Sequence, residues 1–308
     1  MSDRMKEIHL EIVRVTEAAA IAASAWIGSG DKKSADKAAT DGMRSRFDGI
    51  DFSGRIVIGE GIKDASAGLF SGELVGKRSK EESAKYDLAV DPIEGTRPTA
   101  NSGPEALSVL AVAEKDSLFS THEFYMNKMA YGPNIFKKTK LSIIDPLSRT
   151  IELIGKATDK DRNQIMVCIL DRPRHEKIIT ELRSLGVRIK LIQDCDVSAA
   201  IAACHAESGI DLLYGIGGAP EGIITACAIK CLRGDFQTQI VHKDGSIDHK
   251  VYFLDDLVKG PCAFSATGIT DGSLLKGVRY MAEGPVTHSV FMRSISGTVR
   301  WITSYHGN

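Results

Sequence analysis

The sequence predicts an α/β protein with a largely parallel sheet covered by helices. The clearest observation is the order strand, helix, strand, helix, strand, helix between residues 164 and 232. A second is a pair of helices near the start, one at about 5–27 with apolar residues at helical spacing and an alanine-rich one that ends at about Phe47. A third is a set of apolar runs that end at acidic residues. Together these observations favour a sheet whose strand ends carry a polar site.

The composition excludes several classes of partner. Of the 308 residues, 43% are hydrophobic and 26% are charged, as in a soluble globular protein. The net charge of −1 gives no electrostatic reason to expect a nucleic acid or a membrane surface. The six cysteines lack a CxxC spacing, so we expect no disulfide framework and a reducing cytoplasm. No uncharged run reaches about 18 residues, so no transmembrane helix is predicted.

The most informative stretch is Tyr86–Thr99, in which a short apolar strand runs into Asp91 and Pro92. Pro92 fixes its own φ and holds Asp91 out of the helical region, so the strand is expected to stop there. Asp91 and Glu94 would then lie close together, followed by a Gly-Thr turn. Two hard oxygen ligands beside such a turn suit Mg²⁺ or Mn²⁺ bound together with a phosphate. The alternative is an ordinary polar turn.

Three more acids stand at predicted element ends. Asp36 is expected in the first turn of the second helix, where it could be only a helix starter. Glu60 lies between two glycines after a strand, and Glu221 begins a helix. Five converging carboxylates would repel one another, so their convergence would require metal ions. Two cations about 3.5–4 Å apart can activate a water and stabilise the leaving oxygen of a phosphate ester.

The second half places charged residues where strands end. Ligands of parallel sheets bind beyond the carboxyl ends of the strands. These positions hold Arg172, Arg174, Asp194, Asp196 and Glu221. The two arginines suit a second, non-reacting phosphate, although a surface Arg-Pro-Arg turn is the alternative. The serine-hydrolase elbow, the zinc-protease HExxH pair and the Walker A loop are all missing from the sequence, and Gly215–Gly218 lacks the full dinucleotide pattern.

At this point the motifs resemble a known family, the class II (GlpX-type) fructose-1,6-bisphosphatases, in the wider superfamily that includes inositol monophosphatases. The matching stretches, in order, are GDKKSAD (30–36), RIVIGEG (55–61), DLAVDPIEGTRPTA (87–100), RPRH (172–175), LYGIGGAPEG (213–222) and FSATGIT (264–270). The resemblance implies a layered α/β/α/β/α sugar-phosphatase fold with mixed sheets. It also implies metal-dependent hydrolysis of the 1-phosphate of fructose 1,6-bisphosphate, a step of gluconeogenesis in the cytoplasm.

The resemblance also implies roles for individual residues. The ligands of two or more Mg²⁺ or Mn²⁺ ions would be Asp36, Glu60, Asp91, Glu94 and Glu221. Asp64 and Thr96 would be catalytic, positioning or activating the attacking water. The substrate would be held by Glu94, Gly95, Thr96, Tyr125, Arg172, Pro173, Arg174, Asp194, Cys195, Asp196 and Gly218. Asp87 is left out of the metal site, because four residues of extended strand, about 13 Å, separate it from Asp91.

The chain departs from the family pattern at several points. The family usually carries acids at the positions of Ile62 and Ala65, and Asp-Gly-Asp where this chain has Asp-Cys195-Asp. The segment between residues 234 and 255 is also shorter than in many relatives. Sedoheptulose 1,7-bisphosphate or an inositol phosphate therefore stays open as the preferred ester, as does a sugar-phosphate-binding protein without catalysis.

The expected organisation has two parts. Residues 1–140 would form a half that holds the metal site, and residues 141–308 an α/β half that completes the substrate site. Tyr125 and Lys128, taken alone, look like ordinary surface residues. We expect a homo-oligomer, either a dimer or a tetramer, that acts on a small-molecule sugar bisphosphate.

Overall fold

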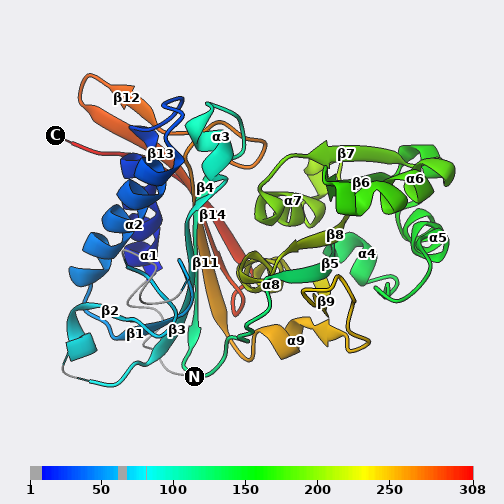
Figure 1. The fold of residues 1–308 in the computed structure, drawn as a ribbon, viewed down its shortest axis with the longest axis horizontal. Helices are drawn as coiled ribbons and strands as arrows, with labels where there is room; N and C mark the ends of the chain where they lie inside the picture. Colours follow the sequence, from blue (N-terminus) through cyan, green and yellow to red (C-terminus); the bar gives the residue numbers. More distant parts are fainter. Residues whose placement is uncertain (1–8, 62–67, 81, 308) are drawn as a thin grey trace. The chain divides into compact units, whose positions relative to one another are not determined.

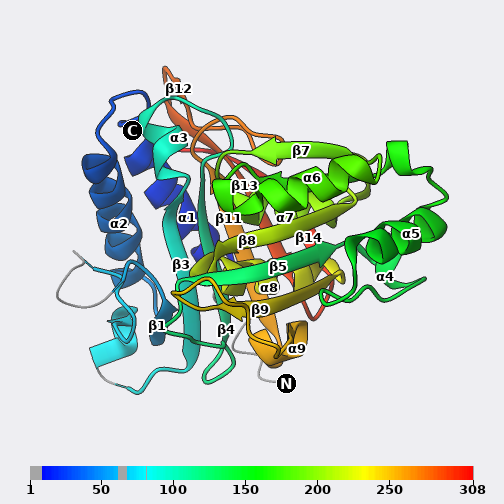
Figure 2. The same cartoon turned by 45° about the vertical axis from the view of Figure 1, so that its right-hand side comes forward.

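The structure is a computed structural model that describes residues 9–61, 68–80 and 82–307. Its chain packs into two compact units (Figures 1 and 2). The first unit contains residues 1–120 and 258–308, and the second contains residues 121–257. The second unit is therefore an insertion into the first. The predicted parts, 1–140 and 141–308, do not coincide with these units, because the last strands of the chain return to the first sheet.

The first unit is built on a mixed sheet. Among the described residues this sheet has eight strands in the order β12-β13-β11-β4-β3-β1-β2, with β14 also pairing with β13. The strands are β1 (Gly54–Ile58), β2 (Leu74–Val75), β3 (Tyr86–Glu94), β4 (Leu107–Glu114), β11 (Cys262–Gly268), β12 (Arg279–Met281), β13 (Gly284–Arg293) and β14 (Thr298–Tyr305). β1 and β3 are parallel, and the other pairs are antiparallel. β13 and β14 form an antiparallel hairpin that turns between Arg293 and Thr298.

Two long helices, α1 (His9–Ser24) and α2 (Lys32–Asp48), lie together against this sheet (Figure 1). The predicted apolar stripe of the first helix is confirmed at Ile12, Val15 and Ala19, which are buried in the core of the unit. Smaller helical segments are η2 (Lys77–Lys80) and α3 (Thr96–Ala100). The helices thus cover a sheet whose strands β1 and β3 deliver the predicted acids.

The strand that carries the Asp-Pro motif does not stop at the proline, as the sequence had suggested. β3 runs through Pro92 to Glu94, and its pairing with β4 shifts register between Asp91 and Glu94. Three steps on β3 oppose two steps on β4, which is a β-bulge. A proline lacks the N–H for the ladder, and bulges tolerate it. The motif is therefore a bulge within a paired strand, followed by a turn at Gly95.

The second unit has a sheet of six strands among the described residues, in the order β10-β9-β5-β8-β6-β7. Its strands are β5 (Tyr125–Tyr131), β6 (Met166–Leu170), β7 (Arg188–Ile192), β8 (Leu212–Gly218), β9 (Asp235–Val241) and β10 (Tyr252–Phe253). β6, β7 and β8 are parallel as predicted, whereas β5 pairs antiparallel with both β8 and β9. The sheet is consequently mixed rather than largely parallel.

Helices cover both faces of the second sheet. The helical segments are α4 (Pro133–Phe136), α5 (Leu147–Thr158), η3 (Arg162–Gln164), η4 (Pro173–His175), α6 (Glu176–Ser184), α7 (Asp196–Ala203), η5 (Ala206–Ser208), α8 (Ala219–Leu232) and α9 (Leu254–Leu257). Met129 and Tyr131 of β5 share a core with α5, while Met126 and Lys128 lie under the start of α8. Alternate residues of a strand face opposite sides, so α5 and α8 cover opposite faces.

The predicted class, α/β with mixed sheets covered by helices, is confirmed. None of the helices in the described part of the chain is long and apolar enough to cross a membrane.

Candidate functional site

The first unit joins Asp36 to the turn that follows β3. The hydroxyl of Thr96 donates a hydrogen bond of 2.8 Å to Oδ1 of Asp36. Burial raises the pKa of the half-buried Asp36 carboxyl, and the Thr96 hydrogen bond opposes that rise. The predicted place of Asp36 in the first helical turn is wrong, because Asp31 is the N-cap of α2 and accepts from Ser34 N at 3.0 Å. Asp36 is thus not needed as a helix starter, and its carboxylate faces the motif turn.

The bulge of β3 determines where Asp91 and Glu94 lie. Asp91 Oδ1 accepts a hydrogen bond of 3.0 Å from Ile93 N, which holds its carboxylate over the bulge. The Glu94 side chain is buried, with 4% of its surface exposed. Gly95 then adopts a left-handed conformation, with φ of 101°, that most side chains disfavour. The glycine therefore lets the chain turn directly from Glu94 into α3.

Glu60 follows the neighbouring strand at the same level. Ile58 of β1 pairs with Ala89 of β3 in a parallel register, and Glu60 and Asp91 each come two residues later. Neighbouring strands lie about 5 Å apart, so Glu60 follows the end of β1 beside the stretch of β3 that carries Asp91. A Cβ on Gly59 would lie 2.0 Å from the carbonyl oxygen of Leu69, so only glycine fits this close approach. Asp64, like Ile62 and Ala65, lies outside the described residues.

Asp87 has partners away from the predicted metal ligands, in agreement with its exclusion from that site. Its buried carboxylate accepts from Arg55 Nη2 at 2.8 Å and from the backbone N–H of Ser117 at 3.0 Å. Its role is therefore to fasten the N-terminal ends of β1 and β3 to the loop after β4.

In the second unit, the Arg-Pro-Arg turn is anchored by its neighbours. Arg172 Nη2 forms an ion pair of 2.7 Å with Asp194, and Pro173 begins η4. Arg174 lies over the ring of Tyr125, 5.2 Å from its centre, and donates through Nε and Nη2 to the carbonyl oxygen of Ile216 at 3.1 and 2.8 Å. These contacts fix both guanidinium groups, and the phosphate-binding role of the turn stays a prediction.

His175 completes this anchor, although the sequence reasoning gave it no role. Its ring is fully buried, with Nδ1 2.7 Å from the carbonyl oxygen of Leu170. Nε2 accepts from Ile216 N at 2.8 Å, so Nδ1 carries the proton. Burial lowers the pKa of His175, which keeps the ring neutral. Ile216 is thereby held through its N–H by His175 and through its C=O by Arg174.

The Asp-Cys-Asp segment enters α7 through a left-handed residue. Cys195 has φ of 67°, a conformation in which glycine is favoured, and its side chain is buried. Asp196 is also buried, and its Oδ2 accepts from Lys128 Nζ at 2.8 Å. A Cβ on Gly217 would lie 2.0 Å from that same oxygen. The glycine-rich end of β8 therefore makes room for a buried ion pair.

Lys128 contradicts the sequence interpretation of a surface residue, since only 1% of it is exposed. The signal was available in Tyr125–Tyr131, YMNKMAY, where apolar residues fall on both faces of the strand, as in strands covered on both sides. Tyr125 agrees better with its prediction, because 47% of it is exposed.

Glu221 lies in the first turn of α8, after Pro220, as predicted. A Cβ on Gly218 would lie 1.8 Å from its Oε2, so the glycine makes space for this carboxylate. Burial raises the pKa of Glu221, and the positive charge of Lys128 opposes that rise. Its buried Oε2 has no hydrogen-bond partner among the described residues. A buried carboxylate oxygen in this state fits a hard cation such as Mg²⁺ or Mn²⁺ as its partner.

Residues 9–61, 68–80 and 82–307 contain no ready-made group of three or more His, Cys, Asp or Glu side chains for a metal. The five predicted acids are divided between the units, with Asp36, Glu60, Asp91 and Glu94 in the first and Glu221 in the second. Their joint action on metal ions stays a prediction.

A pocket of about 490 Å³ opens beside the arginine turn. It lies wholly in the second unit and is lined by Glu123, Phe124, Tyr125, Arg174, Ile216, Val241, His242, Lys243 and Gly245. Two of these residues, Tyr125 and Arg174, were predicted to hold substrate. Lys243, from the shortened segment after β9, was not singled out in the sequence.

The FSATGIT motif serves packing rather than the site. Ser265 and Thr267 lie fully buried on β11 and bond to the hydroxyl of Thr16 in α1 at 3.0 and 2.8 Å. Thr267 also contacts Ser289 of β13 at 2.8 Å. These hydroxyls satisfy one another where α1 crosses the sheet.

Comparison with known proteins identifies the family of this chain. Residues 6–306 match the sequence model of the family described as bacterial fructose-1,6-bisphosphatase, glpX-encoded. A protein of Thermosynechococcus vestitus is 38% identical over 333 residues, covering 97% of this chain and 95% of that protein. One from Crocosphaera subtropica is 38% identical over 330 residues, covering 96% and 95%. Both are named D-fructose 1,6-bisphosphatase class 2/sedoheptulose 1,7-bisphosphatase.

A solved structure, the extragenic suppressor from Pyrococcus furiosus, is 14% identical, with a TM-score of 0.33 over 63% of this chain and 68% of that one.

An α/β fold with acids and paired arginines at strand ends, and with these sequence relatives, defines a phosphatase. Within that class, the chain belongs to the family of bacterial, glpX-encoded fructose-1,6-bisphosphatases.

Proposed function

We propose that this protein is a divalent-metal-dependent phosphatase that hydrolyses the 1-phosphate of fructose 1,6-bisphosphate to fructose 6-phosphate and phosphate. The observation that carries the proposal is the hydrogen bond between Thr96 and Asp36, which fastens a predicted metal ligand to the turn that would face the phosphate. A purely structural turn would not need a half-buried acid from another element beside it. We place the reaction in cytoplasmic gluconeogenesis, as the family resemblance implies.

The predicted acids would share one role. The metal ions would be held by Asp36, Glu60, Asp91, Glu94 and Glu221. When bound, Mg²⁺ or Mn²⁺ would supply Lewis-acid polarisation of the phosphoryl group and an activated water. Thr96 would orient the attacking water through its hydroxyl, with Asp64 as the proposed acceptor of the proton. The Glu94-Gly95-Thr96 turn would contact the phosphate, as the family resemblance implies.

The second unit would hold the non-reacting end of the substrate. Arg174 is already directed by Ile216 and Tyr125, so little side-chain freedom is lost when a phosphate binds. It lines the 490 Å³ pocket together with Tyr125 and Lys243. We place the far phosphate of the sugar bisphosphate in this pocket, with Arg172 and Asp194 as a fixed pair beside it.

Sedoheptulose 1,7-bisphosphate is the second candidate substrate. The names of the relatives favour it, since they carry both activities. Both sugars present a 1-phosphate to the reacting turn and a second phosphate at the far end. The two proposals therefore share one mechanism and differ only in how the pocket takes the distal carbons.

The test is a phosphate-release panel with fructose 1,6-bisphosphate, sedoheptulose 1,7-bisphosphate and inositol 1-phosphate, each with Mg²⁺ and with Mn²⁺. Turnover should vanish with EDTA and return with metal. The ratio of kcat/KM values chooses between the two sugars. Turnover that survives thorough metal removal would contradict the proposal.

Two substitutions sharpen this test. Glu60→Gln and Asp91→Asn each remove an anionic ligand and should abolish turnover. Glu176→Gln is the matched control, because Glu176 is an exposed acid in the first turn of α6. Near-normal activity in both ligand variants would remove these residues from the site. Sugar-phosphate binding without any phosphate release would instead indicate a binding protein.

We further propose a homo-oligomer, a dimer or a tetramer, which light scattering on the purified protein can test.

A further inference from the structure

Lys128 is the buried cation of the second unit that neither the family motifs nor the proposed mechanism uses. It lies in β5, opposite Gly215 of β8 and Thr238 of β9, with 1% of its surface exposed. Removing an ammonium group from water is strongly unfavourable unless fixed negative charges surround it. A methionine would fill the same space without that cost. The lysine therefore has to be explained by what its charge does.

The contacts of Lys128 converge on residues of the proposed site. Its Nζ donates to Asp196 Oδ2 at 2.8 Å. A Cβ on Gly217 would lie 2.9 Å from Nζ, and one on Gly222 would lie 3.4 Å from Cε and 3.9 Å from Nζ. The ammonium group thus lies between the end of β8 and the first turn of α8. Two glycines leave the space that it occupies.

This place is unfavourable for a cation on structural grounds alone. The N-terminus of a helix carries partial positive charge, which repels a lysine and attracts an acid. Lys128 therefore does not stabilise α8. Asp196, at the start of α7, offsets the repulsion through its 2.8 Å bond to the ammonium group. Glu221 is the acid in the first turn of α8, next to Gly222, where that group lies.

We propose that Lys128 is a positioning residue that orients Asp196 for the sugar phosphate and balances the charges of Asp196 and Glu221 before metal and substrate bind. This inference rests on the proposed roles of those two acids. It deepens the proposed function by adding a fixed cation that links the substrate-binding and metal-binding residues of the second unit.

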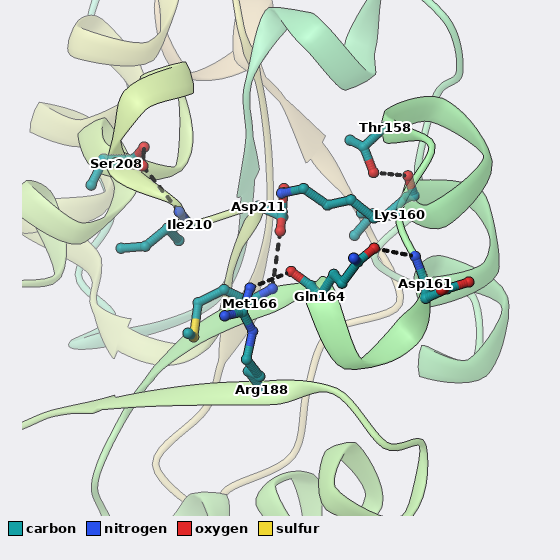
Figure 3. Close-up of polar contacts among 11 residues, drawn as sticks. Thr158, Lys160, Asp161, Gln164, Met166, Arg188, Ser208, Ile210 and Asp211 are labelled. Atoms are coloured by element: carbon teal, nitrogen blue, oxygen red, sulfur yellow. Dashed lines mark hydrogen bonds and ion pairs between the residues drawn. The ribbon is translucent and has the colours of Figure 1, made fainter.

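A matched structural control exists in the same unit. Lys160 forms an ion pair of 2.6 Å with the buried acid Asp211, whose other oxygen accepts from Met166 N at 2.9 Å (Figure 3). Neither Lys160 nor Asp211 belongs to the proposed site. Lys160→Met therefore breaks another pair of lysine and buried aspartate, in which the lysine is one-third exposed, without touching the proposed chemistry.

The experiment compares Lys128→Met with Lys160→Met at pH 8. The readouts are KM, kcat, the Mn²⁺ concentration for half-maximal activity, and the melting-temperature shifts given by fructose 6-phosphate alone and by Mn²⁺ alone. For Lys128→Met we expect KM to rise at least tenfold and the fructose 6-phosphate shift to fall. The Mn²⁺ concentration for half-maximal activity should be unchanged or lower, because a competing positive charge has been removed. Lys160→Met should lower the melting temperature only.

A double variant keeps the test decisive if Lys128→Met folds poorly. Lys128→Met/Asp196→Asn removes both charges, so no uncompensated acid stays buried. If Lys128 acts through Asp196, the double variant should match Asp196→Asn in KM within twofold. Additive losses in the double variant would overturn the proposal, as would a wild-type KM in Lys128→Met. Equal weakening of the Mn²⁺ and fructose 6-phosphate responses would reduce Lys128 to a structural residue.

The binding readouts separate this inference from the proposed function. A wild-type protein without phosphate release from any sugar bisphosphate would end the proposed function. The melting-temperature shifts with fructose 6-phosphate and Mn²⁺ would still decide the role of Lys128.

Discussion

The hydroxyl of Thr96 and the carboxylate of Asp36, 60 positions apart in the sequence, meet in a hydrogen bond of 2.8 Å. Thr96→Val removes this donor while keeping the shape of the side chain. We expect kcat to fall at least tenfold, because both the orientation of Asp36 and the proposed water-positioning group are lost. The free energy of unfolding should fall by about 1 kcal/mol. Thr96→Ser keeps the hydroxyl and should retain most of the activity. An unchanged kcat in Thr96→Val would separate the bond from catalysis.

The buried ring of His175 predicts a dependence of stability on pH. Its pKa in the folded protein lies below the unfolded value of 6.5, so the unfolded state binds the extra proton more readily. The stabilising contribution is complete above pH 6.5 and is lost as the pH falls through 6.5 toward the folded pKa. His175→Gln should reduce the slope of unfolding free energy against pH in this range by up to about 1.4 kcal/mol per unit. Chemical denaturation between pH 5 and 8 measures it.

The exposed His249 supplies the control for this measurement. His249→Gln should leave the acid slope as it is in the wild type. A wild-type slope in His175→Gln would show that the ring is not the group responsible. His175 binds the N–H of Ile216, and Arg174 binds its C=O. We therefore expect His175→Gln to raise KM as well.

The left-handed backbone of Cys195 predicts unequal losses of stability for two small changes. Cys195→Val places a β-branched residue at φ of 67° and should destabilise the protein by about 2 kcal/mol or more. Cys195→Gly relieves the backbone but loses a buried side chain, so its stability should stay within about 1 kcal/mol of the wild type. Thermal and urea unfolding distinguish the two. Equal stability of both variants would contradict the role assigned to the backbone conformation.

Lys243 offers a test of the pocket beside Arg174. Lys243→Ala should raise KM for sugar bisphosphates about two- to fivefold at low salt, since the group is exposed and its attraction is screened. The turnover number should not change, because the far phosphate does not react. Lys177→Ala, at an exposed position of α6, is the control. If KM is the same in both variants, the far phosphate binds elsewhere.

The parts of this structure that could be predicted from the sequence depend on local patterns. The alternation of strands and helices from Met166 to Leu232 was correct because each element carries its own period and its own start and stop residues. The helix start at Glu221 was also predicted correctly. Local chemistry determines these features.

The parts that could not be predicted depend on distant partners. Pro92 looks like the end of a strand, and only the pairing of β3 with β4 turns it into a bulge. Lys128 has only an indirect signal, the apolar residues on both faces of its strand, and its partner Asp196 lies 68 positions away. The return of β11–β14 to the first sheet has no signal in any single segment, since pairing with β4 joins residues about 150 apart. Family resemblance supplied the site residues because the spacing of the acids alone left ordinary turns as alternatives.

The insertion of the second unit determines the order in which the protein can be completed during synthesis. Leu118 and Val258 form an isolated antiparallel bridge, so the chain leaves the first unit and re-enters it at one point. β11 lies between β4 and β13, in the middle of the first sheet. A ribosome therefore releases every residue of the inserted unit before that sheet can close. The first unit begins to be translated first, but it becomes native last. The edge of β4 stays unpaired until the C-terminal strands have been made.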